Sequence, residues 1–331
     1  MEKEYLNNKR VFVTGGAGFI GSHFVEELLA LGSHVTCCDL TCTKSSFKEM
    51  GIKTDSLSTV SIDLLDLPTL KKAVQGHDLL INCAALDGNA EFKAKNAAKI
   101  LDVNMRIVSN VLNASESAHI QDVVLLSSAE VYPASATSPI KEENDYRVAF
   151  DNLQNGYALS KRYAEMLADL YSTQYKMHIY LPRPTNVYGP RDNFGEGSKR
   201  VIPGMIRKVL SGEAIELWGD GKQIRSFVYV KDLVHMILTT TEKKVVGKIN
   251  IATPEPIAIV DLAQLIARVA DKPPTIRLLS DKPSGIRERV LDCLKIDGVI
   301  DFRPKLLREG ISTTIECYNK MTPVYIGNIM K

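Results

Sequence analysis

The sequence predicts an α/β protein with a doubly wound parallel sheet and a smaller mixed α/β lobe near the C-terminus. Three observations indicate this fold. Apolar strands alternate with amphipathic helices through residues 1–190, a glycine-rich turn follows the first strand, and the alternation loosens beyond Gly189. Near-continuous apolar strands separated by helices are typical of a parallel sheet that is covered on both faces.

The first unit joins a strand to a helix through glycines. Residues 9–14 form an apolar, β-branched run, the glycine turn follows at residues 14–21, and apolar residues then recur at helical spacing up to Leu31. The spacing reads either as Gly16-x-Gly18-x-x-Gly21 or as Gly15-x-x-Gly18-x-x-Gly21. Glycines there allow a tight turn and let backbone amides approach a pyrophosphate at the helix N-terminus. The arrangement therefore predicts a dinucleotide site in a Rossmann-type sheet.

Asp39 ends the second predicted strand, 18 residues beyond Gly21. A carboxylate at this position accepts hydrogen bonds from the adenosine ribose and repels a 2′-phosphate. The sequence therefore favours NAD over NADP. Thr41, Thr43 and Lys44 lie close by and leave NADP as the less favoured alternative.

The alternation continues along the chain. Further strands are predicted at residues 60–64, 79–85, 123–128 and 179–183, and helices at 68–74, 97–118 and 157–175. Beyond Gly189, the predicted helices are 201–210, 230–240 and 259–270, interleaved with short strands at 215–218 and 248–251. We assign residues 1–190 to an NAD-binding domain and 191–331 to a substrate-binding lobe, with the chain interleaving between the two.

Composition narrows the class of protein. The chain is 45% hydrophobic and 24% charged, as expected of a globular fold rather than a disordered one. A net charge of +2 and dispersed basic residues argue against nucleic acid or membrane as the partner. No apolar run approaches the ~18 residues of a membrane span, and the N-terminus lacks a signal-peptide core, so we expect a cytoplasmic protein. The scattered cysteines and histidines predict no metal site.

Tyr157 and Lys161 are the residues that indicate chemistry. Four residues apart, they lie on the same face of the predicted helix. A nearby ammonium and an oxidised nicotinamide both favour the phenolate form of a tyrosine. Tyr157 is therefore a candidate general base that takes a hydroxyl proton while hydride leaves the carbon. Such a pair occurs by chance in many helices, and the glycine turn upstream is what makes a catalytic role for it the favoured interpretation.

Several segments, taken in order, resemble a known family. They are residues 14–21, 82–85, 127–132, the Tyr157–Lys161 pair and 183–190. As a set they resemble the extended short-chain dehydrogenase/reductases that act on nucleotide sugars, the epimerase/dehydratase group. The resemblance implies tightly held NAD, a nucleotide-diphosphate sugar substrate, transient oxidation at C4 to a 4-keto sugar, and a homodimer formed through the helices at 97–118 and 157–175.

The resemblance also implies roles for individual residues. Ser128 hydrogen-bonds the sugar C4 oxygen, and Lys161 holds the nicotinamide ribose while lowering the pKa of the Tyr157 base. The matching cofactor positions are Gly15, Gly18, Phe19, Ile20, Gly21, Asp39, Asp63, Leu64, Ala84, Ala85 and Pro184. The matching substrate positions are Asn186, Arg200, Val201, Trp218, and the diphosphate-binding Arg225 and Arg289.

Residues near the predicted base bear on the choice of reaction. Glu130 occupies the place of the C5 base of the dehydratases, but Ala129 replaces the aspartate that protonates their departing hydroxyl, which argues against 4,6-elimination. Tyr132-Pro133 and Lys199 are similar to GDP-mannose 3,5-epimerases and GDP-fucose synthases. Lys199 is favoured over Arg200 as a proton carrier because the pKa of a lysine shifts readily on burial.

The predicted function is therefore an NAD-dependent nucleotide-sugar epimerase that works through a 4-keto intermediate. Three alternatives stay open. They are a dehydratase or decarboxylase that uses Glu130, an NADPH-dependent 4-keto-sugar reductase, and a non-catalytic NAD-binding sensor. For Glu130, Lys199 and Arg200, a solvated surface charge also remains an alternative.

Overall fold

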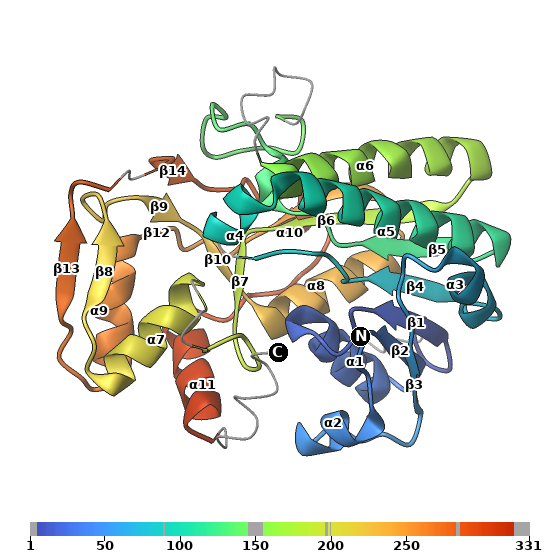
Figure 1. The fold of residues 1–331 in the computed structure, drawn as a ribbon, viewed down its shortest axis with the longest axis horizontal. Coiled ribbons are helices and arrows are strands. Elements are labelled where there is room, and N and C mark those ends of the chain that lie inside the picture. Colours follow the sequence, from blue (N-terminus) through green and yellow to red (C-terminus); the bar gives the residue numbers. More distant parts are fainter. Residues whose placement is uncertain are drawn as a thin grey trace. The chain divides into compact units, whose positions relative to one another are not determined.

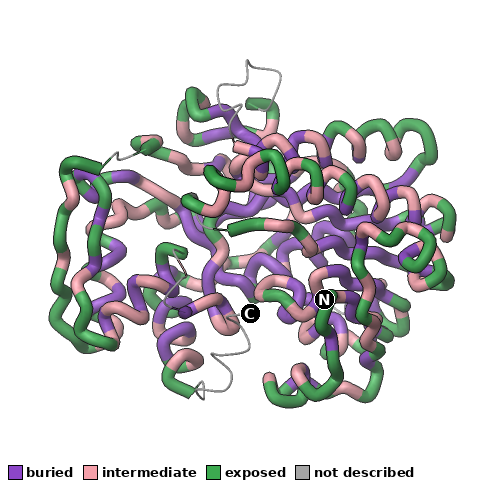
Figure 2. Tube along the Cα trace, viewed as in Figure 1, coloured by how far each residue is buried: buried purple, intermediate pink, exposed green. Residues whose placement is uncertain are grey.

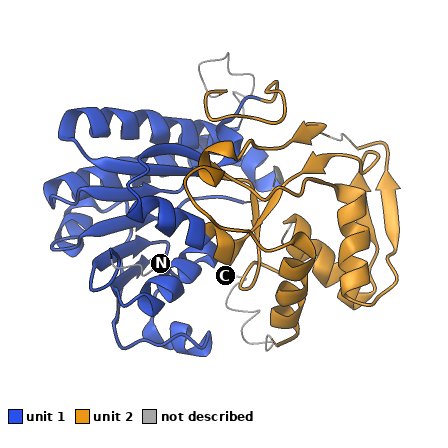
Figure 3. Cartoon of the chain, turned by 180° about the vertical axis from the view of Figure 1, so that it is seen from behind, with its two compact units in different colours: residues 1–133, 145–183, 234–249 blue, residues 134–144, 184–233, 250–331 orange. Residues whose placement is uncertain are grey.

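The computed structural model describes residues 5–88, 90–144, 155–195, 198, 200–282 and 285–320. The chain forms two compact units (Figure 3). Unit 1 comprises residues 1–133, 145–183 and 234–249, and unit 2 comprises residues 134–144, 184–233 and 250–331. The sequence-based division at residue 190 expected the chain to interleave between its two parts, and in the two units residues 134–144 and 234–249 depart from a single division along the chain. Residues 234–249 belong to unit 1 because the strand that begins at Gly247 joins the sheet of that unit.

Unit 1 is built on a seven-stranded sheet with the order β11-β6-β5-β4-β1-β2-β3 (Figure 1). The strands are β1 Arg10–Thr14, β2 His34–Asp39, β3 Leu57–Ser61, β4 Leu79–Asn82, β5 Asp122–Leu125, β6 His178–Pro184 and β11 Gly247–Ile251. Strands β1 to β6 pair in parallel. The predicted doubly wound parallel sheet is thus confirmed. In such sheets, ligands bind beyond the carboxyl ends of the strands where the order reverses, here at β1 and β4.

Three predicted strands differ from the observed ones by three residues at one or both ends. The third strand occupies Leu57–Ser61 instead of residues 60–64. Ile62 and Leu64 follow it in a loop and pack against the core, which explains their apolar character. Strands β4 and β5 end at Asn82 and Leu125, several residues earlier than predicted. The residues after them form the loops at the carboxyl edge of the sheet.

The helices α5 and α6 run side by side in Figure 1. The helices of this part of the chain are α1 Phe19–Ala30, α2 Lys44–Glu49, α3 Leu67–Ala73, α4 Ala90–Lys95, α5 Ala97–Ser117, the 3₁₀ turn η1 Ala129–Val131, α6 Gly156–Tyr175 and α8 Val230–Glu242. A Cβ at Gly156 would collide with the carbonyl of Ala97, so the start of α6 lies directly against the start of α5. Asn155 caps α6 by accepting a hydrogen bond from the Ala158 amide at 3.1 Å.

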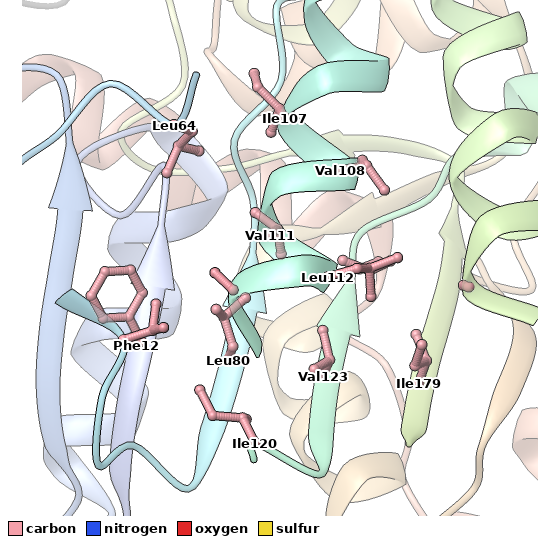
Figure 4. Close-up of a cluster of buried hydrophobic side chains, with 14 of the residues drawn as sticks. Phe12, Leu64, Leu80, Ile107, Val108, Val111, Leu112, Ile120, Val123 and Ile179 are labelled. Carbon is pink, nitrogen blue, oxygen red and sulfur yellow. The ribbon is translucent and has the colours of Figure 1, made fainter. Parts of the chain in front are cut away.

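The core of unit 1 lies between this helix pair and the sheet. Val111 and Leu112 of α5 pack in one buried cluster with Val123 of β5 and Ile179 of β6 (Figure 4). Strands β1, β4 and β5 are buried almost throughout (Figure 2). Burial of apolar side chains on both faces holds the strand ends, and hence the loops that follow them, in fixed positions.

Unit 2 combines helices with short strand pairs. Its helices are α7 Val201–Ser211, α9 Ile259–Val269, α10 Leu294–Asp297 and α11 Leu307–Lys320. Its strands are β7 Asn186–Tyr188 beside β10 Phe227–Tyr229, β8 Ile215–Trp218 beside β13 Ile276–Leu279, and β9 Ile224–Arg225 between β12 Ile257–Ala258 and β14 Glu288–Arg289. Ile206, Leu262 and Ile311 are fully buried in its core. Helix α11 was not predicted, although Leu307, Ile311 and Ile315 recur at helical spacing.

Candidate active site

The glycine turn connects β1 to the N-terminus of α1. Gly15 has a φ of +63°, and a Cβ there would lie 2.7 Å from the Ala84 amide nitrogen. A Cβ at Gly21 would collide with the Gly15 carbonyl. Gly18 is the N-cap of α1, and no side chain caps this end and no acidic residue lies in its first turn. The turn therefore forms a cradle that a side chain would fill, with a helix N-terminus suited to an anion. These residues fit the pyrophosphate of NAD.

Asp39 lies beside this turn at the end of β2. Its Oδ2 accepts a hydrogen bond from the Ala17 amide at 3.1 Å, and its Oδ1 accepts one from the Leu40 amide at 2.8 Å. The carboxylate is thus oriented by backbone amides next to the glycine turn. This position suits recognition of ribose hydroxyls and disfavours a 2′-phosphate.

The other predicted cofactor residues fall mostly on the same edge of the sheet. Asp63 and Leu64 lie in the loop after β3, where Asp63 accepts a hydrogen bond from the Leu65 amide at 2.9 Å. Ala84 and Ala85 follow β4, and Ala84 abuts Gly15. Phe19 and Ile20 begin α1, while Pro184 ends β6. Their roles in binding remain predictions.

Tyr157 and Lys161 lie in the first two turns of α6. The Nζ of Lys161 is 5.5 Å from the centre of the Tyr157 ring and donates a hydrogen bond to the Leu126 carbonyl at 2.6 Å. Lys161 is 8% exposed, and burial lowers its pKa to about 8. A buried ammonium beside a phenol favours ionisation of that phenol. The geometry therefore suits the predicted roles of both residues.

The loop after β5 carries two serines with different partners. Ser127 donates a hydrogen bond to Glu165 at 2.6 Å. Glu165 also pairs with Arg183, and both side chains of that ion pair are fully buried. Ser127 is therefore part of a structural network beneath the site. The Ser128 hydroxyl accepts a hydrogen bond from the Glu130 amide at 3.1 Å and caps η1, which leaves its proton available to a sugar oxygen.

Glu130 is held by a residue that sequence patterns did not indicate. Lys93 of α4 lies 2.7 Å from Oε1 of Glu130 and 3.1 Å from Oδ1 of Asp87. The same ammonium is 4.1 Å from the centre of the Tyr157 ring. On the other side, Asn155 donates a hydrogen bond to Oε2 of Glu130 at 2.9 Å.

The charge of Lys93 is stabilised by these neighbours. Burial alone would lower its pKa, but Glu130 and Asp87 together outweigh burial and raise the pKa above its ordinary value. Lys93 is thus a cation at neutral pH, placed against the face of the predicted catalytic tyrosine. No local sequence pattern singled out Lys93, because residues 87–95 form a stretch without apolar periodicity.

Apart from Ser128, the predicted substrate residues that the structure describes lie in unit 2. Arg225 of β9 and Arg289 of β14 are register partners on neighbouring strands. The Arg225 guanidinium donates to the carbonyls of Ile224 at 2.7 Å and Ile286 at 2.8 Å. Burial and then the charge of Arg289 lower the pKa of Arg225. Two adjacent guanidinium groups suit a diphosphate, which would relieve their mutual repulsion.

The remaining predicted substrate residues are more dispersed within this unit. Arg200 pairs with Asp192 at 2.8 Å and donates to the Val187 carbonyl at 2.8 Å, so part of its guanidinium is engaged by the protein itself. Asn186 donates to the Ser226 carbonyl at 3.0 Å, Trp218 ends β8 with 53% of its surface exposed, and Val201 begins α7. Lys199 lies outside the described residues.

The residues that the structure describes were also searched for metal-ligand clusters and for membrane-spanning helices. Within them, no cluster of three or more His, Cys, Asp or Glu side chains has the geometry of a metal site. Among the helices of the same ranges, none has the length and apolar character needed to cross a bilayer.

Comparison with known proteins identifies the class of enzyme. Residues 11–252 match the NAD dependent epimerase/dehydratase family, and the chain belongs to this family. It is 41% identical over 317 residues to a dTDP-4-dehydro-6-deoxy-D-allose reductase from a Streptomyces species, covering 94% of this chain and 96% of that protein. It is 31% identical over 322 residues to a UDP-N-acetyl-alpha-D-glucosaminuronate decarboxylase from Bacillus cytotoxicus, covering 95% and 98%.

A solved structure agrees with this assignment. The UDP-glucose 4-epimerase of Thermus thermophilus, in complex with NAD, superimposes with a TM-score of 0.80 at 26% identity, covering 95% of this chain and 100% of that one. The protein is therefore an NAD-dependent enzyme of the nucleotide-sugar epimerase, dehydratase and reductase class. The predicted family, fold class and cofactor are confirmed.

Proposed function

We propose that the protein is a 4-keto-sugar reductase that acts on a nucleotide-diphosphate sugar, with Tyr157 as the proton donor to the C4 oxygen. The sequence alone favoured an epimerase and left this activity as an alternative. Two observations support the change. The Streptomyces reductase is 41% identical to the chain over nearly its full length, and the carboxylate of Glu130 is engaged on both oxygens by Lys93 and Asn155.

The state of Glu130 favours a reductase over activities that remove a proton from carbon. A 3- or 5-epimerase or a dehydratase takes a proton from a carbon beside a transient ketone, and this step needs a base oriented toward that carbon. Inversion at C4 needs no such base, so the similarity to the Streptomyces reductase is what favours reduction over 4-epimerisation. A carboxylate that is ion-paired and hydrogen-bonded is fixed in place and partly neutralised. A reductase needs no such base, because only the carbonyl oxygen exchanges a proton. Ala129 likewise offers no proton to a leaving hydroxyl.

In this reaction, the side chains of the protein orient the ketone, donate a proton to it and stabilise the phenolate that is left. Bound NADH supplies the hydride that reduces the C4 carbonyl carbon. Ser128 donates a hydrogen bond to the carbonyl oxygen, and Tyr157 donates the proton that this oxygen gains as the alcohol forms. The buried Lys161 ammonium stabilises the resulting phenolate until solvent restores its proton. Asp39 makes NADH the preferred reductant.

The substrate that this site suits is a 4-dehydro-6-deoxy sugar joined to a nucleoside diphosphate. The diphosphate would bind the guanidinium groups of Arg225 and Arg289. The name of the Streptomyces relative suggests a dTDP-linked sugar.

The test is a panel of dTDP-, UDP-, GDP- and CDP-linked 4-dehydro-6-deoxy sugars incubated with the purified protein and NADH. Stoichiometric oxidation of NADH with gain of two hydrogens by the sugar supports the reductase. A change of stereochemistry without oxidation of NADH would establish an epimerase instead. A UDP-hexuronate is incubated with the protein and NAD⁺ in parallel, and loss of carbon dioxide from it would establish a decarboxylase. Binding of NADH without turnover of any sugar would favour the sensor.

The oligomeric state and the location stay predictions. We propose a homodimer formed through α5 and α6, and light scattering of the purified protein tests it. A cytoplasmic location is likewise a proposal, and imaging of a tagged full-length chain tests that.

A further inference from the structure

Lys93 holds two groups of the site at once. Its Nζ lies 2.7 Å from the Glu130 carboxylate and 4.1 Å from the centre of the Tyr157 ring. The side chain is 18% exposed, so its contacts are only partly screened by water. Glu130 comes from the loop after β5 and Lys93 from α4, and the two residues are 37 positions apart in the chain.

Asn155 completes a clamp on the same carboxylate. It donates its side-chain amide to Oε2 of Glu130 at 2.9 Å, and its carbonyl oxygen caps α6 at the turn that carries Tyr157. Both oxygens of Glu130 are therefore bound to groups that also touch the helix of the predicted proton donor. We refer to Lys93, Glu130 and Asn155 as the carboxylate clamp.

A 4-keto sugar bound near this clamp is open to a side reaction, the removal of a proton from a carbon beside the ketone. The ketone makes the hydrogens on the neighbouring carbons acidic, and a free carboxylate near the donor tyrosine can remove one. The C–H bond would break, the proton would pass to Glu130, and the electron pair would move to the C4 oxygen, which Tyr157 would protonate to give an enol. Reversal of these steps would return a proton from solvent to carbon. Without Lys93, Oε1 of Glu130 would lose the ion pair that holds it in place and would be free to turn toward such a hydrogen.

We propose that Lys93 is a specificity-determining residue that suppresses this carbon-acid chemistry by pairing with Glu130, so that the site reduces its ketone without exchanging the adjacent hydrogens. The inference rests on the proposed reductase function. Lys93 acts here as a positioning residue, through Glu130 rather than on the substrate.

The experiment measures exchange and reduction separately. Wild type and Lys93→Met are incubated in deuterium oxide with NAD⁺ and the 4-dehydro-6-deoxy nucleotide sugar that the wild type reduces. Deuterium at the carbons beside the ketone is followed by proton NMR, after subtraction of the protein-free rate. Lys93→Met should exchange at least about tenfold faster than wild type, since a positioned general base contributes such factors. Lys93→Met/Glu130→Gln should return to the wild-type rate, and Lys93→Arg should stay near it.

A matched control comes from the same helix. Lys95 is 72% exposed at its side chain and pairs with Glu91 at 3.0 Å, so Lys95→Met removes a cation from α4 without touching the clamp. Its exchange rate should equal that of wild type. Thermal melting and NADH binding verify the fold of each variant, and Lys93→Gln replaces Lys93→Met if the latter does not fold.

The outcomes separate the inference from the proposed function. If wild type oxidises NADH with the ketone but Lys93→Met exchanges no faster, the role assigned to Lys93 is wrong and the reductase stands. Fast exchange that persists in the double variant also overturns that role. If wild type reduces no 4-keto nucleotide sugar, the proposed function fails, and the inference fails with it.

Discussion

The ammonium of Lys161 lies 5.5 Å from the centre of the Tyr157 ring, and burial lowers its pKa to about 8. The cation is therefore present below that pH and is lost as the pH rises through it. Because the charge stabilises the phenolate, kcat/KM for ketone reduction should fall above about pH 8. The pH profile of kcat/KM reports groups of the free enzyme and is the appropriate measurement.

Lys161→Arg provides the control for this profile. A guanidinium keeps its charge across the accessible range, so the variant should be slower but should lose the decline near pH 8. A decline at the same pH in both proteins would assign it to another group. The free energy of unfolding should rise with pH between about 8 and 10.4 in the wild type, since the unfolded chain then binds the proton that folded Lys161 releases.

Gly15→Ala should weaken cofactor binding. The substitution places a Cβ in a backbone conformation with φ of +63° and 2.7 Å from the Ala84 amide nitrogen. Gly51→Ala is the matched control, since its φ is +76° but nothing lies within 4 Å of the added atom. The control should lose only about 1–2 kcal/mol of unfolding free energy.

Urea unfolding and NADH titration distinguish the two glycines. Gly15→Ala should lose more stability than Gly51→Ala, and its dissociation constant for NADH should rise by at least about tenfold, which corresponds to about 1.4 kcal/mol. Equal NADH affinity in the two variants would show that the turn does not hold the cofactor.

Asp39→Ser should broaden the choice of reductant. The carboxylate lies 3.1 Å from the Ala17 amide of the glycine turn, where it disfavours a 2′-phosphate. Removing it should raise the ratio of kcat/KM for NADPH to that for NADH by about tenfold or more. Asp55→Asn, an exposed carboxylate in the loop before β3, should leave this ratio unchanged.

Arg225→Met should weaken substrate binding more than turnover. Arg225 and Arg289 are adjacent in register and suit a diphosphate. The KM for the nucleotide sugar should rise by about tenfold or more while kcat changes little, because this contact is the same in the ground and transition states. Arg277→Met, at an exposed arginine that pairs with Glu216 at 3.5 Å, should behave as wild type. A loss confined to kcat would contradict the assignment.

The sequence predicted those parts of the structure that depend on local pattern. The glycine turn, the strands on either side of it and the Tyr157 helix follow from spacing and hydrophobic periodicity within short windows. The third strand was placed at residues 60–64 because Ile62 and Leu64 are apolar, whereas these residues pack on the core from a loop. Apolar character reports burial there rather than strand structure.

Local spacing and hydrophobic periodicity could not predict the carboxylate clamp on Glu130. Helix α4 covers only Ala90–Lys95 and has no apolar stripe, so nothing local predicts it. Lys93 meets Glu130 across 37 residues and Tyr157 across a longer interval, contacts that exist only once the sheet brings the loops after β4 and β5 together. The sequence therefore pointed to Tyr157, the proposed proton donor, but not to Lys93, which we propose controls the neighbouring carboxylate.

The most direct test of the account is NADH oxidation by wild type and Tyr157→Phe with a dTDP-linked 4-dehydro-6-deoxy sugar. We predict that the phenylalanine variant binds NADH as wild type does but loses about 10²–10⁴-fold in kcat, the usual contribution of a positioned acid. A variant that reduces the ketone at the wild-type rate would contradict the role of Tyr157 and, with it, the mechanism proposed for this enzyme.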